Sequence, residues 1–155
     1  MPTEIERKFL VRNNNFKSEG PCFYIHQGFL STDKDRVVRV RIAGDEAYLT
    51  IKGRSKGIGR AEFEYGIPIE DARYMLEHLC IRPTIEKNRY RIPMAGFTWE
   101  VDEFLGDNAG LVIAEIELES EGQDFPRPSW LGEEVTGDAR YYNASLVANP
   151  FKSWR

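Results

Sequence analysis

The sequence has few of the residues on which redox, zinc and membrane chemistry depend. Its 155 residues include only two cysteines, Cys22 and Cys80, and their spacing fits no C-x-x-C pair, so we expect free thiols rather than disulfides or a metal clip. The two histidines, His26 and His78, are also far apart, which argues against a histidine-based zinc site. No apolar run approaches about 18 residues, and the N-terminus MPTEIERK lacks the order of a signal peptide. We therefore expect a cytoplasmic protein that does not enter a membrane.

Several catalytic and binding motifs are missing as well. Gly53, Gly57 and Gly59 fall in a turn without the G-K-[ST] ending of a P-loop, so any phosphate would have to be held by side chains. There is no G-x-S-x-G and no Cys/His pair, which leaves acyl transfer and redox chemistry without support. The 21 Lys+Arg against 25 Asp+Glu give a net charge of −4, which argues against an extended nucleic-acid surface.

The chain reads as one domain over residues 1–155, with strands followed by short helices. Period-2 patterns and turn signals predict about eight strands, over residues 3–11, 23–30, 36–43, 46–53, 60–67, 85–92, 97–105 and 111–119. Helical spacing predicts a helix over 69–79 and a second over 139–150, with Asp138 as its N-cap, and a short helical turn around 129–135. These elements define an α+β protein.

The charged side chains keep to one parity on strand after strand. In EIERKFLV, Glu4, Glu6 and Lys8 alternate with other residues, and Arg39 and Arg41 alternate with valines and an isoleucine. Seven strands show this alternation of charged and apolar residues, whereas the solvated face of a sheet usually carries a less regular mixture of polar residues. We therefore predict an eight-stranded antiparallel β-barrel, a tunnel with a charged polar lumen and an apolar outside covered by a few helices. A solvated sheet face is the alternative.

The predicted lumen charges nearly balance. Eight acids face seven bases, a sum of −1; they are Glu4, Glu6, Glu62, Glu64, Glu100, Asp102, Glu115 and Glu117 against Lys8, Arg39, Arg41, Lys52, Lys87, Arg89 and Arg91. Unpaired buried charges are costly, so such an interior should bind ions of both signs. Two Mg²⁺ ions and a triphosphate of about −4 would bring the sum close to zero.

The ordered motifs resemble those of one family. E-I-E-R-K at residues 4–8 resembles the E-x-E-x-K signature of the CYTH superfamily, the triphosphate tunnel metalloenzymes that include class IV adenylate cyclases and thiamine triphosphatases. The later landmarks agree in order: R-V-R-I at 39–42, T-I-K at 50–52, E-F-E at 62–64, E-K-N-R at 86–89, W-E-V-D-E-F at 99–104 and E-I-E-L-E at 115–119. The resemblance spans nearly the whole chain and implies a tunnel that binds a triphosphate and divalent metal.

The resemblance also implies roles for individual residues. The catalytic set would be Glu4, Glu6, Lys8 and Lys87. The substrate-binding set would be Lys8, Arg39, Arg41, Lys52, Lys87 and Arg89. The metal ligands would be Glu4, Glu6, Glu62, Glu64, Asp102, Glu115 and Glu117, holding Mg²⁺ or Mn²⁺, two ions in all. Outside these sets, Arg91 and Glu100 could form lumen ion pairs, and Arg140 and Lys152 could close one tunnel mouth or lie on the surface.

The expected activity is metal-dependent hydrolysis of a triphosphate, with inorganic tripolyphosphate favoured over ATP or thiamine triphosphate because no clear base- or thiazole-reading group is visible. Tyr24, Phe29 and Tyr48 are the aromatic candidates for such a group, although each is more often a core residue. The alternatives are a class IV adenylate cyclase, a polyphosphate- or nucleotide-binding module without turnover, and a structural domain with lumen salt bridges. No nucleic-acid or membrane partner is expected, and a homodimer follows only from its general frequency.

Overall fold

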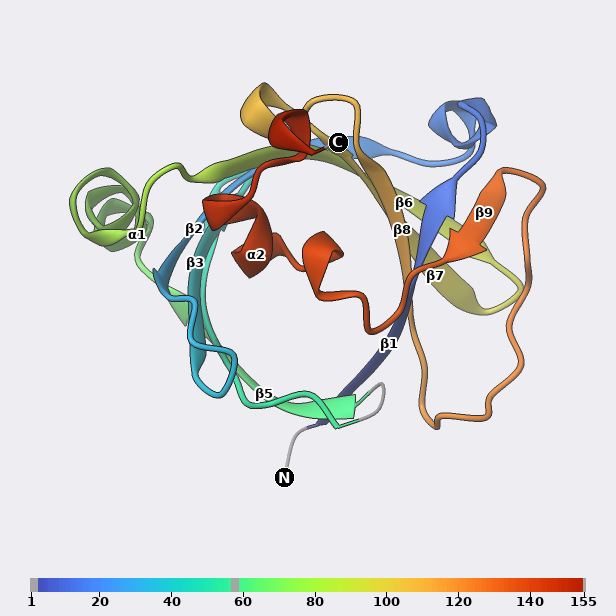
Figure 1. The fold of residues 1–155 in the computed structure, drawn as a ribbon, viewed down its shortest axis with the longest axis horizontal. Coiled ribbons are helices and arrows are strands. Elements are labelled where there is room, and N and C mark those ends of the chain that lie inside the picture. Colours follow the sequence, from blue (N-terminus) through green and yellow to red (C-terminus); the bar gives the residue numbers. More distant parts are fainter. Residues whose placement is uncertain (1–2, 57–58, 155) are drawn as a thin grey trace.

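The computed structural model describes residues 3–56 and 59–154, and an antiparallel sheet dominates them (Figure 1). Its strands are β1 (Thr3–Val11), β2 (Cys22–Ser31), β3 (Val37–Ala43), β4 (Glu46–Lys52), β5 (Gly59–Ile67), β6 (Ile85–Met94), β7 (Phe97–Phe104), β8 (Val112–Glu117) and β9 (Leu131–Glu134). Their order is β5-β4-β3-β2-β6-β7-β8-β1-β9, and β5 also pairs with β1. That pairing closes eight strands into the predicted antiparallel barrel.

The register between strands places the charged residues on one face. Lys8 lies opposite Glu115, Lys52 opposite Glu62, and Arg89 opposite Asp102. Directly opposed residues in an antiparallel pair have side chains on the same face, so one parity of every barrel strand points inward. The charged lumen predicted from the alternation is therefore confirmed.

Two apolar clusters cover the outside of the barrel. One packs Val40 and Ala47 under Ala72 and Leu76, which belong to α1 (Ile69–Tyr74) and the π-helical turn η2 (Met75–Leu79) that continues it. These two elements together fill the range predicted for the first helix. The other cluster is aromatic and includes Phe9, Phe16, Trp99 and Trp130, with Phe16 on the 3-10 turn η1 (Asn15–Ser18). Two more 3-10 turns are η3 (Gly106–Asn108), which precedes β8, and η5 (Phe151–Ser153), near the end of the chain.

A third apolar cluster lies inside the barrel, at one end of the lumen. It joins Phe29, Ile85, Phe104 and Ile113, which share the inward parity of the charged residues, to Leu146 of α2 (Asn143–Ala148). Figure 1 shows α2 lying across the barrel opening rather than on its outer wall. The expectation that the second helix covers the outside was wrong, because its apolar partners are inside the barrel end.

The second helix is also shorter than predicted. Tyr142 has extended dihedral angles, φ −70° and ψ 134°, and separates the 3-10 turn η4 (Ala139–Tyr141) from α2. Asp138 does cap this segment, because its carboxylate accepts a hydrogen bond from the Arg140 backbone N–H at 3.1 Å. The chain therefore bends where it enters the barrel end.

The helical turn predicted around 129–135 is wrong, because this segment forms β9. It pairs with β1 beyond the point where β5 leaves that edge. Gly132 lies so close to the Leu10 carbonyl oxygen that an added Cβ would meet it at 2.8 Å, which explains why glycine stands there. Both cysteines are free, as expected, with Cys22 exposed and Cys80 buried. None of the helices in the described ranges is long and apolar enough to cross a membrane.

Candidate active site

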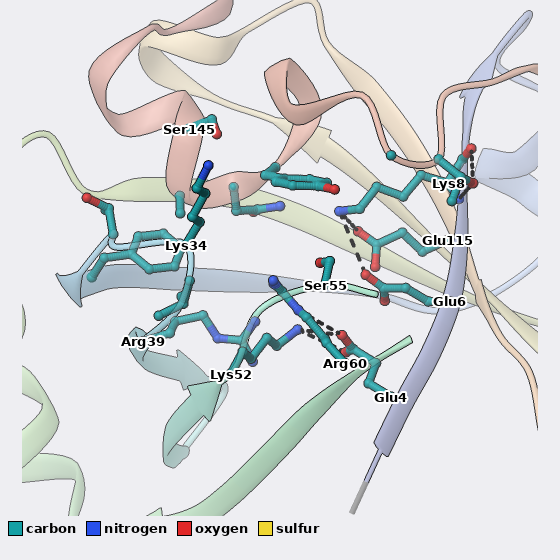
Figure 2. A pocket seen from close by; sticks show the side chains of 18 of the residues that line it. Glu4, Glu6, Lys8, Lys34, Arg39, Lys52, Ser55, Arg60, Glu115 and Ser145 are labelled. Carbon is teal, nitrogen blue, oxygen red and sulfur yellow. Dashed lines mark hydrogen bonds and ion pairs between the residues drawn. The ribbon is translucent and has the colours of Figure 1, made fainter. Parts of the chain in front are cut away.

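Two cavities meet in the middle of the barrel and together form one tunnel. Their volumes are about 470 and 580 Å³, and both are lined by the same central charged residues: Glu4, Glu6, Arg39, Arg41, Lys52, Arg89 and Glu115. The first cavity continues toward α2 and is lined there by Tyr142, Asn143 and Ser145, and the second continues toward the β6–β7 hairpin at Gly96. Figure 2 shows the first cavity with its basic and acidic side chains facing one another.

Arg39 and Arg41 are buried cations with too few partners. Arg39 donates through Nη2 to Thr50 Oγ1 at 3.2 Å and lies 3.6 Å from Glu64, but its buried Nε has no partner in the part of the chain that the structure describes. Arg41 donates through Nε to the neutral amide oxygen of Gln27 at 2.8 Å. Burial and the nearby Arg89 lower the pKa of Arg39, and burial and Arg39 lower the pKa of Arg41 well below its usual range. An anion bound in the tunnel would stabilise the charged forms of both arginines.

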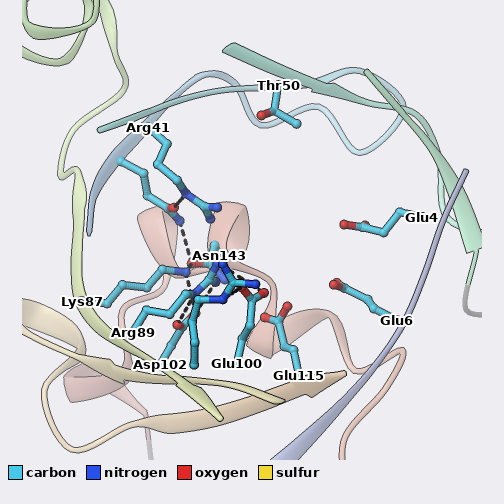
Figure 3. Close-up of polar contacts among 12 residues, drawn as sticks. Glu4, Glu6, Arg41, Thr50, Lys87, Arg89, Glu100, Asp102, Glu115 and Asn143 are labelled. Carbon is cyan, nitrogen blue, oxygen red and sulfur yellow. Dashed lines mark hydrogen bonds and ion pairs between the residues drawn. The ribbon is translucent and has the colours of Figure 1, made fainter. Parts of the chain in front are cut away.

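Asp102 is the buried counter-ion of the neighbouring bases (Figure 3). Its Oδ1 accepts from Arg89 Nε at 2.7 Å, and its Oδ2 accepts from Arg89 Nη2 at 2.9 Å and lies 2.7 Å from Lys87 Nζ. Burial opposes ionisation, yet Arg89 and Lys87 hold the pKa of Asp102 below its ordinary value. Both oxygens are thus engaged by bases, which suits a positioning role.

Lys87 is fully buried and lies at the α2 end of the tunnel. Besides Asp102, its Nζ donates to Asn143 Oδ1 at 2.9 Å. Burial lowers the pKa of Lys87 to about 7; Asp102 opposes that change, and Arg89 and Arg41 add to it. Its charge is therefore sensitive to pH near neutrality.

Glu4 is paired with bases across the β1–β5 closure. Its two carboxylate oxygens accept from Lys52 Nζ at 3.1 and 2.9 Å, and Arg60 Nε lies 3.6 Å away, as Figure 2 shows. Burial opposes ionisation of Glu4, but Lys52 lowers its pKa. Glu62, opposite Lys52 in the ladder, lies 3.4 Å from the same ammonium group.

Glu6 and Glu117 form a pair of like charges. They lie directly opposite each other on β1 and β8, an arrangement that destabilises a sheet unless a cation lies between the carboxylates. Burial and then Glu115 raise the pKa of Glu6 to about 8, and burial and then Glu4 raise the pKa of Glu117. Glu115 itself is neutralised by Lys8, which donates to it at 3.2 Å.

The structure gathers part of the predicted metal set. Glu4, Glu6, Glu115 and Glu117 lie on the adjacent strands β1 and β8 and line the tunnel. Glu62 and Glu64 line it from β5, whereas Asp102 is enclosed by Lys87 and Arg89. Within the described ranges no three of these carboxylates converge as a ready metal site. Two of them, Glu4 and Glu115, are instead held by Lys52 and Lys8.

The predicted substrate-binding residues all line the tunnel, and four of the accessory candidates lie elsewhere. Arg91 is 3.8 Å from Glu100 inside the second cavity, which agrees with a lumen ion pair. Arg140 and Lys152 are exposed and form surface ion pairs with Asp138 and Asp107. The hydroxyls of Tyr24 and Tyr48 bond to Glu86 and Glu46, and neither ring lines a cavity. Phe29 lines the first cavity but belongs to the apolar cluster under α2.

The residues that escaped the sequence reasoning include Arg60 and Asn143, which line the first cavity, and Thr50 and Gln27, which accept hydrogen bonds from Arg39 and Arg41. Arg60 and Thr50 share the charged parity of their strands, so the alternation could have found them. Gln27 faces Arg41 across the β2–β3 ladder, a neutral residue among charges. Asn143 carried no signal, because nothing in its helical pattern shows that α2 enters the barrel end.

Comparison with known proteins finds two curated relatives over nearly the full length of the chain. A curated inorganic triphosphatase of Acetivibrio thermocellus is 54% identical over 155 residues, 100% of this chain and 99% of the relative. One from Nitrosomonas europaea is 38% identical and covers 94% of this chain and 97% of its own length.

Solved structures agree with the fold. The crystal structure of an inorganic triphosphatase superposes with a TM-score of 0.66 at 34% identity, over 92% of this chain and 96% of that one. A putative adenylate cyclase from Bacillus halodurans shares the fold at 19% identity, with a TM-score of 0.60 over 78% of this chain and 84% of that one. The CYTH domain model matches residues 2–149. The chain therefore belongs to the CYTH domain family.

Proposed function

We propose that this protein is an inorganic triphosphatase, which hydrolyses tripolyphosphate with the help of divalent metal ions. The observation that carries the proposal is the excess of poorly paired buried cations, Arg39 and Arg41, directly across the tunnel from the opposed carboxylates Glu6 and Glu117. One half of the tunnel therefore lacks an anion and the other half lacks a cation. The names of the full-length relatives support the same activity.

The phosphates would be bound by side chains from five strands. Guanidinium groups bind phosphate oxygens in pairs, and ammonium groups act as point charges. We assign this role to Lys8, Arg39, Arg41, Lys52, Lys87 and Arg89, and add Arg60, which lines the same cavity. Asp102 fixes the direction of Arg89 and Lys87 and so acts as a positioning residue rather than as a metal ligand.

The donor set suits hard divalent cations such as Mg²⁺ or Mn²⁺, which prefer carboxylate oxygens. Glu6 and Glu117 are the carboxyl groups of β1 and β8 whose pKa is raised, so a bound cation would favour their ionised forms, and Glu4 and Glu115, which accept from lysines, adjoin them. We propose that these four hold two ions, with Glu62 and Glu64 completing the acidic side. When bound, divalent ions polarise phosphoryl oxygens and lower the pKa of bound water.

The chain itself then provides positioning and charge. Lys8 lies between Glu115 and Glu6, at the boundary between the acidic and basic halves. Its ammonium group is therefore placed to stabilise negative charge that develops on the transferred phosphoryl group. Lys87, with a pKa of about 7, is placed to gain a proton when a phosphate binds. Glu4 keeps Lys52 directed into the tunnel.

The geometry favours an inorganic substrate. Of the three aromatic candidates, Tyr24 and Tyr48 line neither cavity and Phe29 is only 2% exposed. Tyr142 does line the first cavity, but its ring already has Lys8 Nζ at 5.7 Å and Arg60 Cζ at 6.0 Å from its centroid, which leaves less of it for a base or a thiazole. ATP and thiamine triphosphate are therefore expected to be poorer substrates. A cytoplasmic location and a homodimer stay predictions.

The test is a comparison of products. Purified protein is incubated with tripolyphosphate, ATP or thiamine triphosphate, each with Mg²⁺, with Mn²⁺ or with EDTA, and phosphate and cyclic AMP are measured. The expected result is fast phosphate release from tripolyphosphate that EDTA abolishes. Cyclic AMP as the main product from ATP would establish the cyclase alternative, and binding without any turnover would establish the binding module.

A further inference from the structure

Asn143 is a neutral residue in the most basic part of the tunnel. It is the first residue of α2, it lines the first cavity, and Figure 3 shows it beside Lys87 and Arg89. Its Oδ1 accepts two hydrogen bonds, from Lys87 Nζ at 2.9 Å and from Gln27 Nε2 at 2.8 Å. No predicted site residue comes from this helix, so the role of Asn143 has to be read from these contacts.

The orientation of the Asn143 amide is fixed from both sides. An arginine can only donate, so the Gln27 oxygen must face Arg41, and the 2.8 Å bond from Arg41 Nε agrees. The Gln27 amino group then faces Asn143, which must present its oxygen. Lys87 can also only donate, and it demands the same oxygen from the other direction. Two independent neighbours thus assign the same orientation to the Asn143 amide.

The Asn143 amino group is consequently left with two N–H donors. Both side-chain hydrogen bonds of Asn143 use its oxygen, and no group among the described residues accepts from its Nδ2. Since the oxygen side is turned toward Gln27 and Lys87, the amino group is the part that remains to face the cavity that Asn143 lines. A ligand oxygen held near Lys87 and Arg41 could accept a hydrogen bond from this amino group.

We propose that Asn143 is a substrate-binding residue whose Nδ2 donates to an oxygen of the phosphate held by Lys87 and Arg41. The identity of the ligand as a linear polyphosphate rests on the proposed function. A neutral donor adds direction without adding to the repulsion among the buried cations. The same amide, through its oxygen, keeps Lys87 in place and so joins α2 to the phosphate site.

Asn143→Asp is the sharpest test, because it keeps one side-chain oxygen in place and replaces only the amino group. One carboxylate oxygen can still accept from Lys87 and Gln27, while the other replaces the amino group with a negative charge facing the phosphate. Asn149→Asp makes the same charge change at the far end of α2, where the Asn149 side chain contacts Ser153 outside both cavities. Tripolyphosphate binding is measured by calorimetry in EDTA, separately from turnover.

We expect Asn143→Asp to weaken binding by about a hundredfold and Asn149→Asp to leave it unchanged, because hydrogen bonds to charged groups are the strong class and repulsion adds to their loss. Asn143→Ala, which removes the donor and also the acceptor for Lys87 without adding charge, should weaken binding about tenfold. Circular dichroism and melting curves check that each variant is folded. Native affinity in folded Asn143→Asp or Asn143→Ala would overturn the assignment.

The measurement also separates this assignment from the proposed function. A native protein that binds tripolyphosphate without hydrolysing it overturns the activity and leaves the role of Asn143 to be decided by the variants. A native protein that hydrolyses tripolyphosphate, with Asn143→Asp binding as tightly, overturns only the role of Asn143. Absence of binding by the native protein overturns both.

Discussion

The two ends of the tunnel differ in the sign of their charge. The charged residues that line only the end next to α2 are Lys8, Lys34, Arg54, Arg60 and Lys87, with no carboxylate among them. Those that line only the end next to the β6–β7 hairpin are Glu62, Glu64, Glu100, Glu117 and Glu119, with Arg91 as the one base. A barrel stabilised by internal salt bridges alone would mix the two signs. Their separation fits the proposed function, in which a polyanion binds at one end and cations bind at the other.

The ends also differ in how they are closed. The basic end is backed by the apolar cluster of Phe29, Ile85 and Phe104 under Leu146, so buried apolar side chains take the place of water on that side of it. Electrostatic interactions strengthen where water is excluded, which favours tight phosphate binding at this end. The acidic end lacks such a cover in the described part of the chain, and its carboxylates are more exposed, for example 33% for the Glu100 side chain against 1% for Asp102.

The largest effect should come from the acidic pair. Glu6→Gln or Glu117→Gln removes the like-charge pair that suits a cation, so we expect Mg²⁺-dependent phosphate release from tripolyphosphate to fall by at least about a hundredfold, a loss of several kcal/mol in transition-state stabilisation. Tripolyphosphate binding in EDTA should be unchanged for Glu6→Gln, because the pKa of about 8 already keeps most Glu6 neutral, and unchanged or tighter for Glu117→Gln, which removes a carboxylate.

The control for this experiment is Glu133→Gln, an exposed carboxylate on β9 that lines neither cavity. It should keep native turnover and native binding. If Glu6→Gln and Glu117→Gln weakened metal-free tripolyphosphate binding as much as they reduced turnover, that result would contradict the assignment of metal binding to the acidic end and phosphate binding to the basic end.

A smaller effect is expected at the cationic centre. Arg39→Gln removes a guanidinium that the protein itself leaves poorly paired, so tripolyphosphate affinity should fall about tenfold to a hundredfold while the melting temperature stays level or rises. Arg91→Gln, a matched change at the acidic end, should alter affinity far less. Calorimetry and thermal melts measure both. If Arg39→Gln lowers stability and leaves affinity intact, Arg39 is part of a structural salt-bridge network instead.

The sequence predicted the barrel and its charged face because a strand has a period of two. Once Lys8, Arg39 and Glu115 share a parity, the ladder can only place them on one face, and closure follows from eight such strands. The pairing within the lumen was harder to predict, because the alternation places Asp102 in the lumen but does not show that Arg89 and Lys87 contact its two carboxylate oxygens.

The parts that were missed depend on contacts distant in sequence. The segment of β9 has no clear alternation between Pro128 and Gly137, and it becomes a strand only because the edge of β1 is free beyond β5. The amphipathic pattern of α2 shows that one face is buried but not whether its partner lies inside or outside the barrel. A signal did exist, because Phe29, Ile85 and Phe104 are apolar on the charged parity.

The smallest effect concerns pH at the basic end. Free Lys87 has a pKa of about 7, and only its charged form favours a bound phosphate, so raising the pH above 7 should weaken binding. At pH 8 about one-tenth of the free protein would carry the charge, which makes the loss roughly tenfold relative to pH 6. Because tripolyphosphate also titrates, the quantity to measure is the ratio of native affinity to Lys87→Met affinity in EDTA.

That ratio should be constant below pH 7 and decline above it. Lys87→Met keeps the Arg89–Asp102 pair, and its binding follows the titration of the ligand, so the ratio isolates the ammonium group. A ratio that stays flat from pH 6 to about 9 would mean that Asp102 and Asn143 keep Lys87 charged throughout. Lys87 would then be charged before any phosphate binds. The difference in charge between the two ends of the tunnel would be larger than the burial of Lys87 implies.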